Sequence, residues 1–168
     1  MPEQETLERA RQDRQEGKSA STQAGEFVRE EMHHIREGKH GARSTKQAIA
    51  IGLSKARRAG VKLGAPEKGA ASEETRRAAR RDLEKGEERK KSVSRTRSRA
   101  TTQALKREGH SAASPKALAQ QAHSAATQRT AGERSASAKK AARTKGAAAR
   151  SAAAKKAART RARKRARH

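Results

Sequence analysis

The stretch from Arg134 to His168 is the part of the sequence whose side chains suggest the clearest chemistry. It contains 14 Lys and Arg residues and no Asp or Glu. Such cations neutralise phosphates, and because each contact releases condensed counterion, the affinity depends on salt and needs no particular base sequence. A purely solubilising role is the alternative, but acid-free basic segments are typical interaction tails. The candidate nucleic-acid-binding residues are Lys139, Lys140, Arg143, Lys145, Arg150, Lys155, Lys156, Arg159, Arg161, Arg163, Lys164, Arg165 and Arg167.

A second group of cations surrounds the segment GKHG, from Gly38 to Gly41, which lies between two expected helices. Its GxxG spacing is that of the clamp with which KH domains hold a nucleic-acid backbone. No alternating apolar strands flank it, so we do not expect a KH fold. Amides at the start of the next helix could hold one phosphate; the simpler interpretation is that the glycines only end a helix and turn the chain. The candidate phosphate contacts are Lys39, Arg43, Lys46, Arg57 and Arg58.

Histidine and glutamate residues between positions 30 and 40 raise the question of a metal site. Glu30 and Glu31 stand at ExxH spacing from His33 and His34, but di-iron bundles need two such motifs on facing helices. Adjacent histidines also point in different directions on a helix. We therefore expect these histidines, together with His40, to be solvated surface residues, and we expect no metal and no other cofactor.

Enzymatic chemistry is not indicated elsewhere in the sequence. There is no Cys, and the GxxxxGK[ST] phosphate-binding loop is absent. The Ser and Thr residues are typical of helix caps and linkers, and no nucleophile with a base and an orienting acid can be assigned. We therefore do not expect an enzyme.

Composition and charge indicate which elements can hold these residues. Only 13 of 168 residues are Leu, Ile, Val or Phe, roughly 8%, whereas strongly charged chains below about 20% are expected to be disordered. The net charge of +25 is uneven: −2 over residues 1–40, +8 over residues 41–93 and +19 over residues 94–168. We therefore expect a small folded nucleus with mobile flanks.

Two amphipathic helices form this expected nucleus. In the first, from about Ser21 to Glu37, apolar residues recur at i, i+4 and i+7. In the second, Ser44 and Gln47 form a capping box and Gly60 provides the stop signal. Helices joined by so short a loop pack as an αα-hairpin. Its predicted core consists of Phe27, Val28, Met32, Ile35, Ile49 and Leu53.

The predicted fold class is therefore all-α, a small helical hairpin with largely disordered, Ala/Lys/Arg-rich flanks that become helical on binding. We expect only a marginal, solvent-facing helix at the N-terminus, because Leu7 is the lone large apolar residue there. The predicted boundaries are a charged N-terminal arm (1–20), the hairpin (21–63), a charged linker or helix (64–93), a weakly helical segment (94–133) and a basic disordered tail (134–168).

Two resemblances rest on these residues. The segment from Phe27 to Gly60, FVREEMHHIREGKHGARSTKQAIAIGLSKARRAG, resembles an uncharacterised family of short basic bacterial proteins, mainly through S-x-K-Q-A-I-A-I-x-L-S-x-A-R. That family carries no established activity. The tail repeats SAKKAART as AAKKAART at an offset of 16 residues and is similar to the arms of bacterial histone H1-like proteins, which condense DNA. The second resemblance implies a nucleoid-associated, DNA-binding protein in the bacterial cytoplasm.

The scarcity of aromatic residues bears on the kind of partner. Single-strand binding and sequence-specific RNA binding rely on aromatic stacking, and this chain has one Phe and no Tyr or Trp. We therefore expect non-specific binding to duplex DNA. Two alternatives stay open, an RNA- or ribosome-associated protein and an adaptor whose hairpin binds a protein. No membrane partner is expected. A homodimer through the face of Ile49 and Leu53 would suit so small a hairpin.

Overall fold

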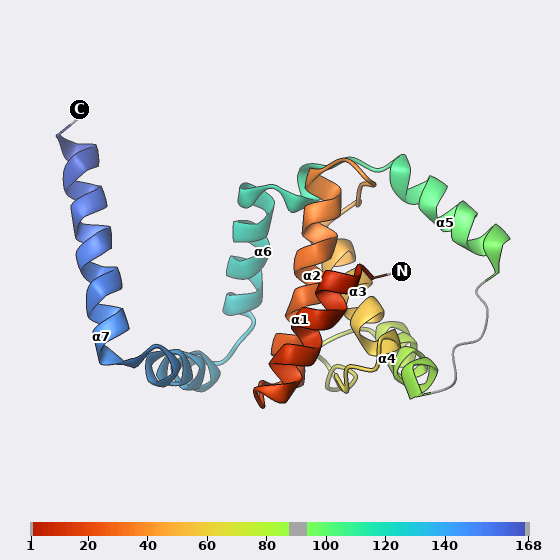
Figure 1. The fold of residues 1–168 in the computed structure, drawn as a ribbon, viewed down its shortest axis with the longest axis horizontal. Coiled ribbons are helices and arrows are strands. Elements are labelled where there is room, and N and C mark those ends of the chain that lie inside the picture. The colour runs from red at the N-terminus through yellow and green to blue at the C-terminus, as the bar shows by residue number, and fades with distance from the viewer. Residues whose placement is uncertain (1, 88–93, 167–168) are drawn as a thin grey trace. The chain divides into compact units, whose positions relative to one another are not determined.

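The protein is described here by a computed structural model that covers residues 2–87 and 94–166, and its regular elements are helices. The chain divides into two compact units, Met1–Gln121 and Ala122–His168. The all-α prediction agrees with this structure, whereas the prediction of largely disordered flanks is wrong, because helices occur along nearly all of the described chain (Figure 1). The elements are α1 (Gln4–Gln15), α2 (Ala20–Arg36), α3 (Thr45–Arg58), α4 (Glu73–Glu87), α5 (Arg95–Lys106), a short 3-10 helix η1 (Ser111–Ala113), α6 (Pro115–Thr127) and α7 (Ala131–Arg165).

The hairpin of α2 and α3 is the centre of the first unit, as the sequence predicts. The amide of Gln47 donates to Ser44 Oγ over 3.2 Å, and Gln47 Oε1 accepts from the amide of Arg43 over 2.8 Å. This confirms the predicted cap of α3. Gly38, with a φ of 74°, turns the chain after α2, a conformation that residues with a Cβ rarely adopt.

A close approach of the two backbones defines the α2–α3 crossing. A Cβ atom placed on Gly52 of α3 would lie only 2.7 Å from Val28 Cα of α2. Ala48 and Ala56, which flank this point one turn away on either side, are fully buried. Small residues therefore bring the helices together, and large apolar side chains fill the space on both sides.

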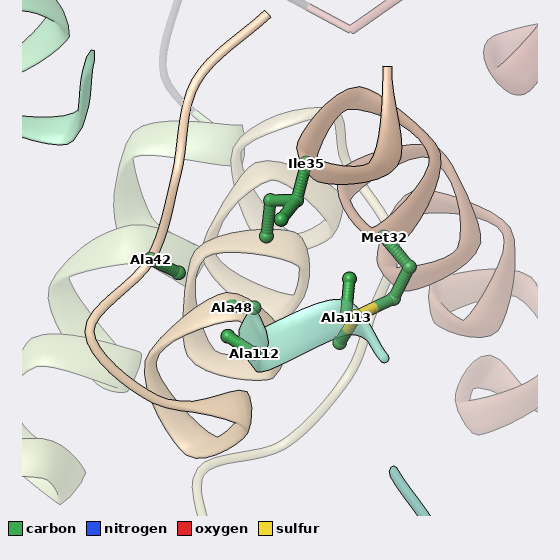
Figure 2. Close-up of a cluster of buried hydrophobic side chains, with 6 residues drawn as sticks. All are labelled: Met32, Ile35, Ala42, Ala48, Ala112 and Ala113. Carbon is green, nitrogen blue, oxygen red and sulfur yellow. The ribbon is translucent and has the colours of Figure 1, made fainter. Parts of the chain in front are cut away.

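Two hydrophobic clusters flank this crossing. The first joins the end of the hairpin to η1 through Met32, Ile35, Ala42, Ala48, Ala112 and Ala113 (Figure 2). The second joins α1 to the hairpin and its exit turn through Ala10, Ala24, Phe27, Ala56 and Val61. All six residues of the predicted hairpin core take part. Phe27, Met32 and Ile35 are buried, and Val28, Ile49 and Leu53 are partly buried against the clusters.

The N-terminal helix is more than a solvent-facing arm. Thr6 and Ala10 of α1 are buried, and Leu7 packs against the second cluster. Arg9 Nε donates to Glu26 Oε2 of α2 over 2.6 Å. The prediction of a marginal helix is therefore corrected, because residues too small to register as an apolar stripe allow α1 to pack closely on α2.

The end of α5 and the segment that follows it close over the loop between α2 and α3. The amides of Gly41 and Ala42 donate to the carbonyls of Leu105 and Gly109 over 2.9 and 3.0 Å. Thr45 Oγ1 donates to the carbonyl of Ala112 over 2.7 Å. These contacts bury Ala112 against the hairpin.

Helix α4 packs on α3 through a buried carboxylate. Asp82 accepts from Ser54 Oγ over 2.6 Å and from Arg58 Nε over 2.7 Å. Gly86 lies so close to the Arg57 carbonyl that a Cβ atom would be 2.1 Å from its oxygen. The region predicted as a charged linker or helix thus contains an anchored helix.

The basic tail is helical as far as Arg165, which corrects the prediction of a disordered tail for the part of residues 134–168 that the structure describes. Thr130 and Glu133 form a capping box: the amide of Thr130 donates to Glu133 Oε2 over 2.7 Å, and the amide of Glu133 donates to Thr130 Oγ1 over 3.2 Å. Alanine, the best helix former, separates the cations, and Gly146, at φ 67° and ψ 164°, divides α7 into two helical halves.

Within residues 2–87 and 94–166, the structure contains no helix that is long and apolar enough to cross a membrane.

Candidate nucleic-acid interface

The predicted tail cations lie on α7, and their described side chains are exposed. Those in the first half are Lys139, Lys140 and Arg143, and those after Gly146 are Arg150, Lys155, Lys156, Arg159, Arg161, Arg163 and Arg165. Lys145 and Lys164 belong to the helix, but their side chains lie outside the description, as does the whole of Arg167.

The repeat in the sequence becomes a repeated cationic stripe in the helix. Successive residues are about 100° apart around a helix axis, so positions i, i+1 and i+4 fall on one face. Lys139, Lys140 and Arg143 form such a face, which we call the first stripe. Lys155, Lys156 and Arg159 form the equivalent second stripe. Each half of α7 therefore presents at least one face with three closely spaced positive charges.

Beyond its first turn, the charged side chains of α7 are all positive. Glu133 is its only acidic residue, and it is engaged in the capping box. Hydrogen bonds from the amide and hydroxyl of Thr130 lower the pKa of Glu133 below its ordinary value of 4.5. No Asp or Glu follows it in the sequence, so the charged side chains of α7 after its first turn are all cations.

The five candidate phosphate contacts of the first unit have different surroundings. Lys39 Nζ lies 3.0 Å from Glu3 Oε1 and 3.1 Å from Glu37 Oε2, and hydrogen bonds to these carboxylates raise the pKa of Lys39. Arg58 is paired with Asp82. Lys39 and Arg58 therefore already form ion pairs with carboxylates of the same chain.

Arg57 is buried, whereas Arg43 and Lys46 are exposed. The Arg57 guanidinium donates to the carbonyls of Leu63 and Gly64 over 3.0 and 3.2 Å, and burial lowers its pKa. Arg57 thus anchors the exit turn of the hairpin. The predicted phosphate contact at the GKHG loop rests on Arg43 and Lys46 alone.

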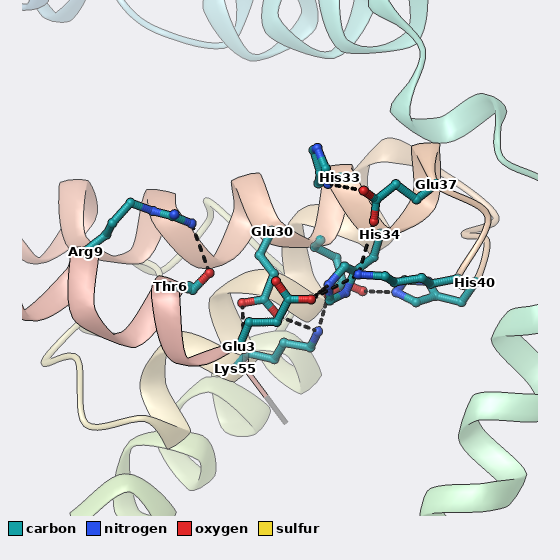
Figure 3. A network of polar contacts seen from close by, with 11 residues as sticks. Glu3, Thr6, Arg9, Glu30, His33, His34, Glu37, His40 and Lys55 are labelled. Atoms are coloured by element: carbon teal, nitrogen blue, oxygen red, sulfur yellow. Dashed lines mark hydrogen bonds and ion pairs between the residues drawn. The ribbon is translucent and has the colours of Figure 1, made fainter.

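A cluster of polar side chains lies where the sequence predicted a solvated surface (Figure 3). Glu30, Glu31 and His34 are buried, and His40 is half-buried. His33 behaves as predicted, since it is exposed and pairs with Glu37 over 3.0 Å. In the sequence, the ExxH spacing was the signal that could have indicated this cluster. The position of His40 could not be predicted, because it depends on the turn that brings the loop back towards α2. Among the described residues, Glu31, His34 and His40 form a group that could hold a metal ion.

Glu3 links this cluster to the N-terminus. Glu3 Oε1 accepts from His34 Nε2 over 2.8 Å, and the Glu3 amide donates to Glu30 Oε2 over 3.2 Å. Hydrogen bonds from His34 and Lys39 lower the pKa of Glu3 to about 2. The Glu3 carboxylate is therefore ionised at neutral pH.

Comparison with known proteins identifies a domain but no activity. No curated protein and no solved structure matches the chain significantly. Residues 17–68, which span α2, α3 and the exit turn, match the sequence model of a family of unknown function (DUF6496).

Proposed function

We propose that the protein binds duplex DNA without sequence specificity through the cations of α7, as a nucleoid-associated protein similar to bacterial histone H1-like proteins. The observation that carries the proposal is the exposure of the two cationic stripes on helices with no acidic residue after Glu133. Each phosphate that they neutralise would release counterion and add affinity. Helical order before binding favours this role, since preorganised segments lose less conformational entropy on association.

The composition of α7 supports backbone contacts over base recognition. Alanine occupies most positions between the cations, so the helix is narrow and could approach the phosphates closely. Sequence reading requires a few side chains held in fixed positions against base edges, whereas the cations of α7 are long, exposed and repeated. Binding should therefore vary little between DNA sequences.

The environment of Phe27 supports duplex over single-stranded targets. This residue is the only aromatic side chain among Phe, Tyr and Trp in the chain, and it is 1% exposed in the second hydrophobic cluster. It is thus unable to offer a stacking platform for unpaired bases. Structured RNA stays an alternative target, because its phosphates would attract the same cations.

The test is a salt titration of binding with fluorescence anisotropy. The full chain, a truncation after Glu133 and a full-length variant with the cations of α7 replaced by Gln are compared on two duplexes of equal length and unrelated sequence. If about half of the 14 cations that follow Glu133 contact phosphates, the log-log slope of affinity against salt should be about −6 for the full chain. Gln keeps a high helix propensity, so the third protein separates loss of charge from loss of helix.

The salt titration has outcomes that support the proposal and outcomes that contradict it. Equal affinity for both duplexes, a steep slope and its loss in both variants would support the proposal. Unchanged affinity and slope in the truncated chain would overturn it. A structured RNA of the same length serves as competitor, and preferential release of the duplex by this RNA would favour the RNA-associated alternative.

A further inference from the structure

We propose that Glu31, His34 and His40 form a binding site for a divalent transition-metal ion, with Zn²⁺ as the expected occupant. Glu31 and His34 project from one face of α2, three positions apart, and His40 comes from the loop that follows it. One ligand atom from each residue can be chosen so that all three lie within 4.8 Å of one another. The site would therefore join two segments of backbone around one ion.

The burial of Glu31 is the first reason to expect a cation here. Glu31 is fully buried, and neither of its carboxylate oxygens has a hydrogen-bond partner. Lys55 Nζ and His40 Nε2 lie 2.5 and 3.1 Å from these oxygens, which is ion-pair distance, but the contacts lack hydrogen-bond geometry. A buried carboxylate requires compensation by a positive charge and by directed contacts. Metal coordination would satisfy both requirements.

The charge balance around Lys55 is a second reason to expect a cation here. Lys55 Nζ also lies 3.7 Å from the buried Oε1 of Glu30, an atom that has no hydrogen-bond partner either. One ammonium group therefore faces two buried carboxylates. The two carboxylates thus share a single ammonium group, and a divalent ion would supply the further positive charge.

The orientation of His40 leaves one ring nitrogen available for the ion. His40 Nδ1 lies 3.1 Å from the carbonyl oxygen of Gly41. Because a carbonyl only accepts hydrogen bonds, this contact uses the proton on Nδ1 and leaves Nε2 as the nitrogen that could bind an ion through its lone pair. Nε2 is the atom that lies 3.1 Å from Glu31 Oε1. A metal-binding histidine commonly donates from its other nitrogen to a carbonyl in this way.

His34 is also held in place by a carboxylate. Its Nε2 donates to Glu3 Oε1 over 2.8 Å, and its ring meets that of His40 edge to face, with centroids 6.0 Å apart. The His34 and His40 side chains are 11% and 14% exposed. The two imidazoles are therefore largely shielded from water.

The ligand types select the class of metal. Two imidazoles and one carboxylate are typical ligands of Zn²⁺ and its first-row neighbours, whereas Ca²⁺ and Mg²⁺ prefer oxygen ligands. Tetrahedral zinc with Zn–N bonds of ~2.0–2.1 Å places its ligand atoms roughly 3.3–3.5 Å apart. His40 Nε2 and Glu31 Oε1 already lie 3.1 Å apart, so the adjustment needed to bind the ion would fall on His34.

The proposal is tested by titrating the full chain with Zn²⁺ in the absence of nucleic acid, with a chromophoric chelator as competitor. We expect one Zn²⁺ per chain in the wild type. His40→Ala and Glu31→Gln should each weaken this binding by more than roughly tenfold, the loss that even outer-sphere changes produce. The matched control is His33→Ala, which removes an exposed histidine from the same helix and should leave the affinity unchanged.

A spectroscopic measurement on the wild type keeps the test independent of how the variants fold. X-ray absorption of the Zn²⁺-loaded chain should show two imidazole ligands and at least one oxygen ligand. A spectrum without imidazole, a wild-type stoichiometry well below one, or equal losses in His33→Ala and His40→Ala would overturn the proposal.

Discussion

Gly52 of α3 faces the backbone of Val28 in α2 so closely that a Cβ atom on Gly52 would lie 2.7 Å from Val28 Cα and 3.0 Å from Val28 N. Backbone atoms in a helix cannot move aside without shifting the whole element. The hairpin therefore depends on having no side chain at this position.

Gly52→Ala should destabilise the chain. Overpacking a core position costs roughly 1–3 kcal/mol, which exceeds the ~1 kcal/mol that Ala gains over Gly in helix propensity. Gly25→Ala is the matched control, since Gly25 lies within α2 and a Cβ atom there meets nothing within 4 Å. The control should be stabilising by about 0.5–1 kcal/mol. Urea unfolding followed by circular dichroism measures both, and equal effects would contradict the described crossing.

Asp82→Ala should release α4 from α3. The substitution leaves Ser54 and Arg58 without the carboxylate that both contact, and losing a charged hydrogen-bond acceptor costs about 1–3 kcal/mol. Amide hydrogen exchange should accelerate within α4 more than in α2. Glu84→Ala, at an exposed position of the same helix, controls for the loss of one negative charge. Similar exchange in both variants would mean that Asp82 does not anchor the helix.

The first turn of α7 should weaken in acid. Hydrogen bonds from Thr130 lower the Glu133 pKa in the folded chain below 4.5, so protonation favours the unfolded turn. The stabilisation is present above about pH 4.5, the ordinary pKa, and is lost as the pH falls through the lowered folded value. Backbone chemical shifts of residues 131–136 should report this loss. Glu133→Gln should remove the pH dependence, and an unchanged titration in this variant would assign it to another group.

Neutralising either cationic stripe should reduce the salt dependence of DNA binding by the same amount. The triple changes to Gln at Lys139, Lys140 and Arg143, or at Lys155, Lys156 and Arg159, each remove three charges and should lower the log-log slope by up to ~2.7. The control carries Gln at Arg77, Arg80 and Arg81, exposed cations of α4. A comparable loss in this control would place the contact surface in the first unit.

Local patterns predicted the hairpin well, because caps and apolar periodicity act within a few residues. Ser44 and Gln47 start α3, and Gly38 ends α2, as their positions indicated. Ser114 likewise accepts from the Ala117 amide over 3.2 Å at the start of α6, a cap formed by residues close in sequence. These interactions need no distant partner, so a reader of the sequence can identify them.

The extent of the folded chain was underestimated for a physical reason. Counting Leu, Ile, Val and Phe assumes that cores are built from large side chains. Here Ala10, Ala24, Ala48, Ala56 and Ala112 are buried, and they contribute by allowing helices to approach closely. A solvated alanine on a basic helix and a buried alanine between two helices are identical in sequence, so only tertiary contacts distinguish them.

The sequence alone determined the all-α class, the hairpin and the concentration of positive charge after Glu133, since helix propensity, capping and charge are local properties. The tertiary structure alone decided that α1 and α4 pack on the hairpin and that residues 105–113 close its loop. It also brought Glu31, His34 and His40 together. These outcomes depend on which surfaces meet across long stretches of chain, which neither the composition nor the spacing of residues records.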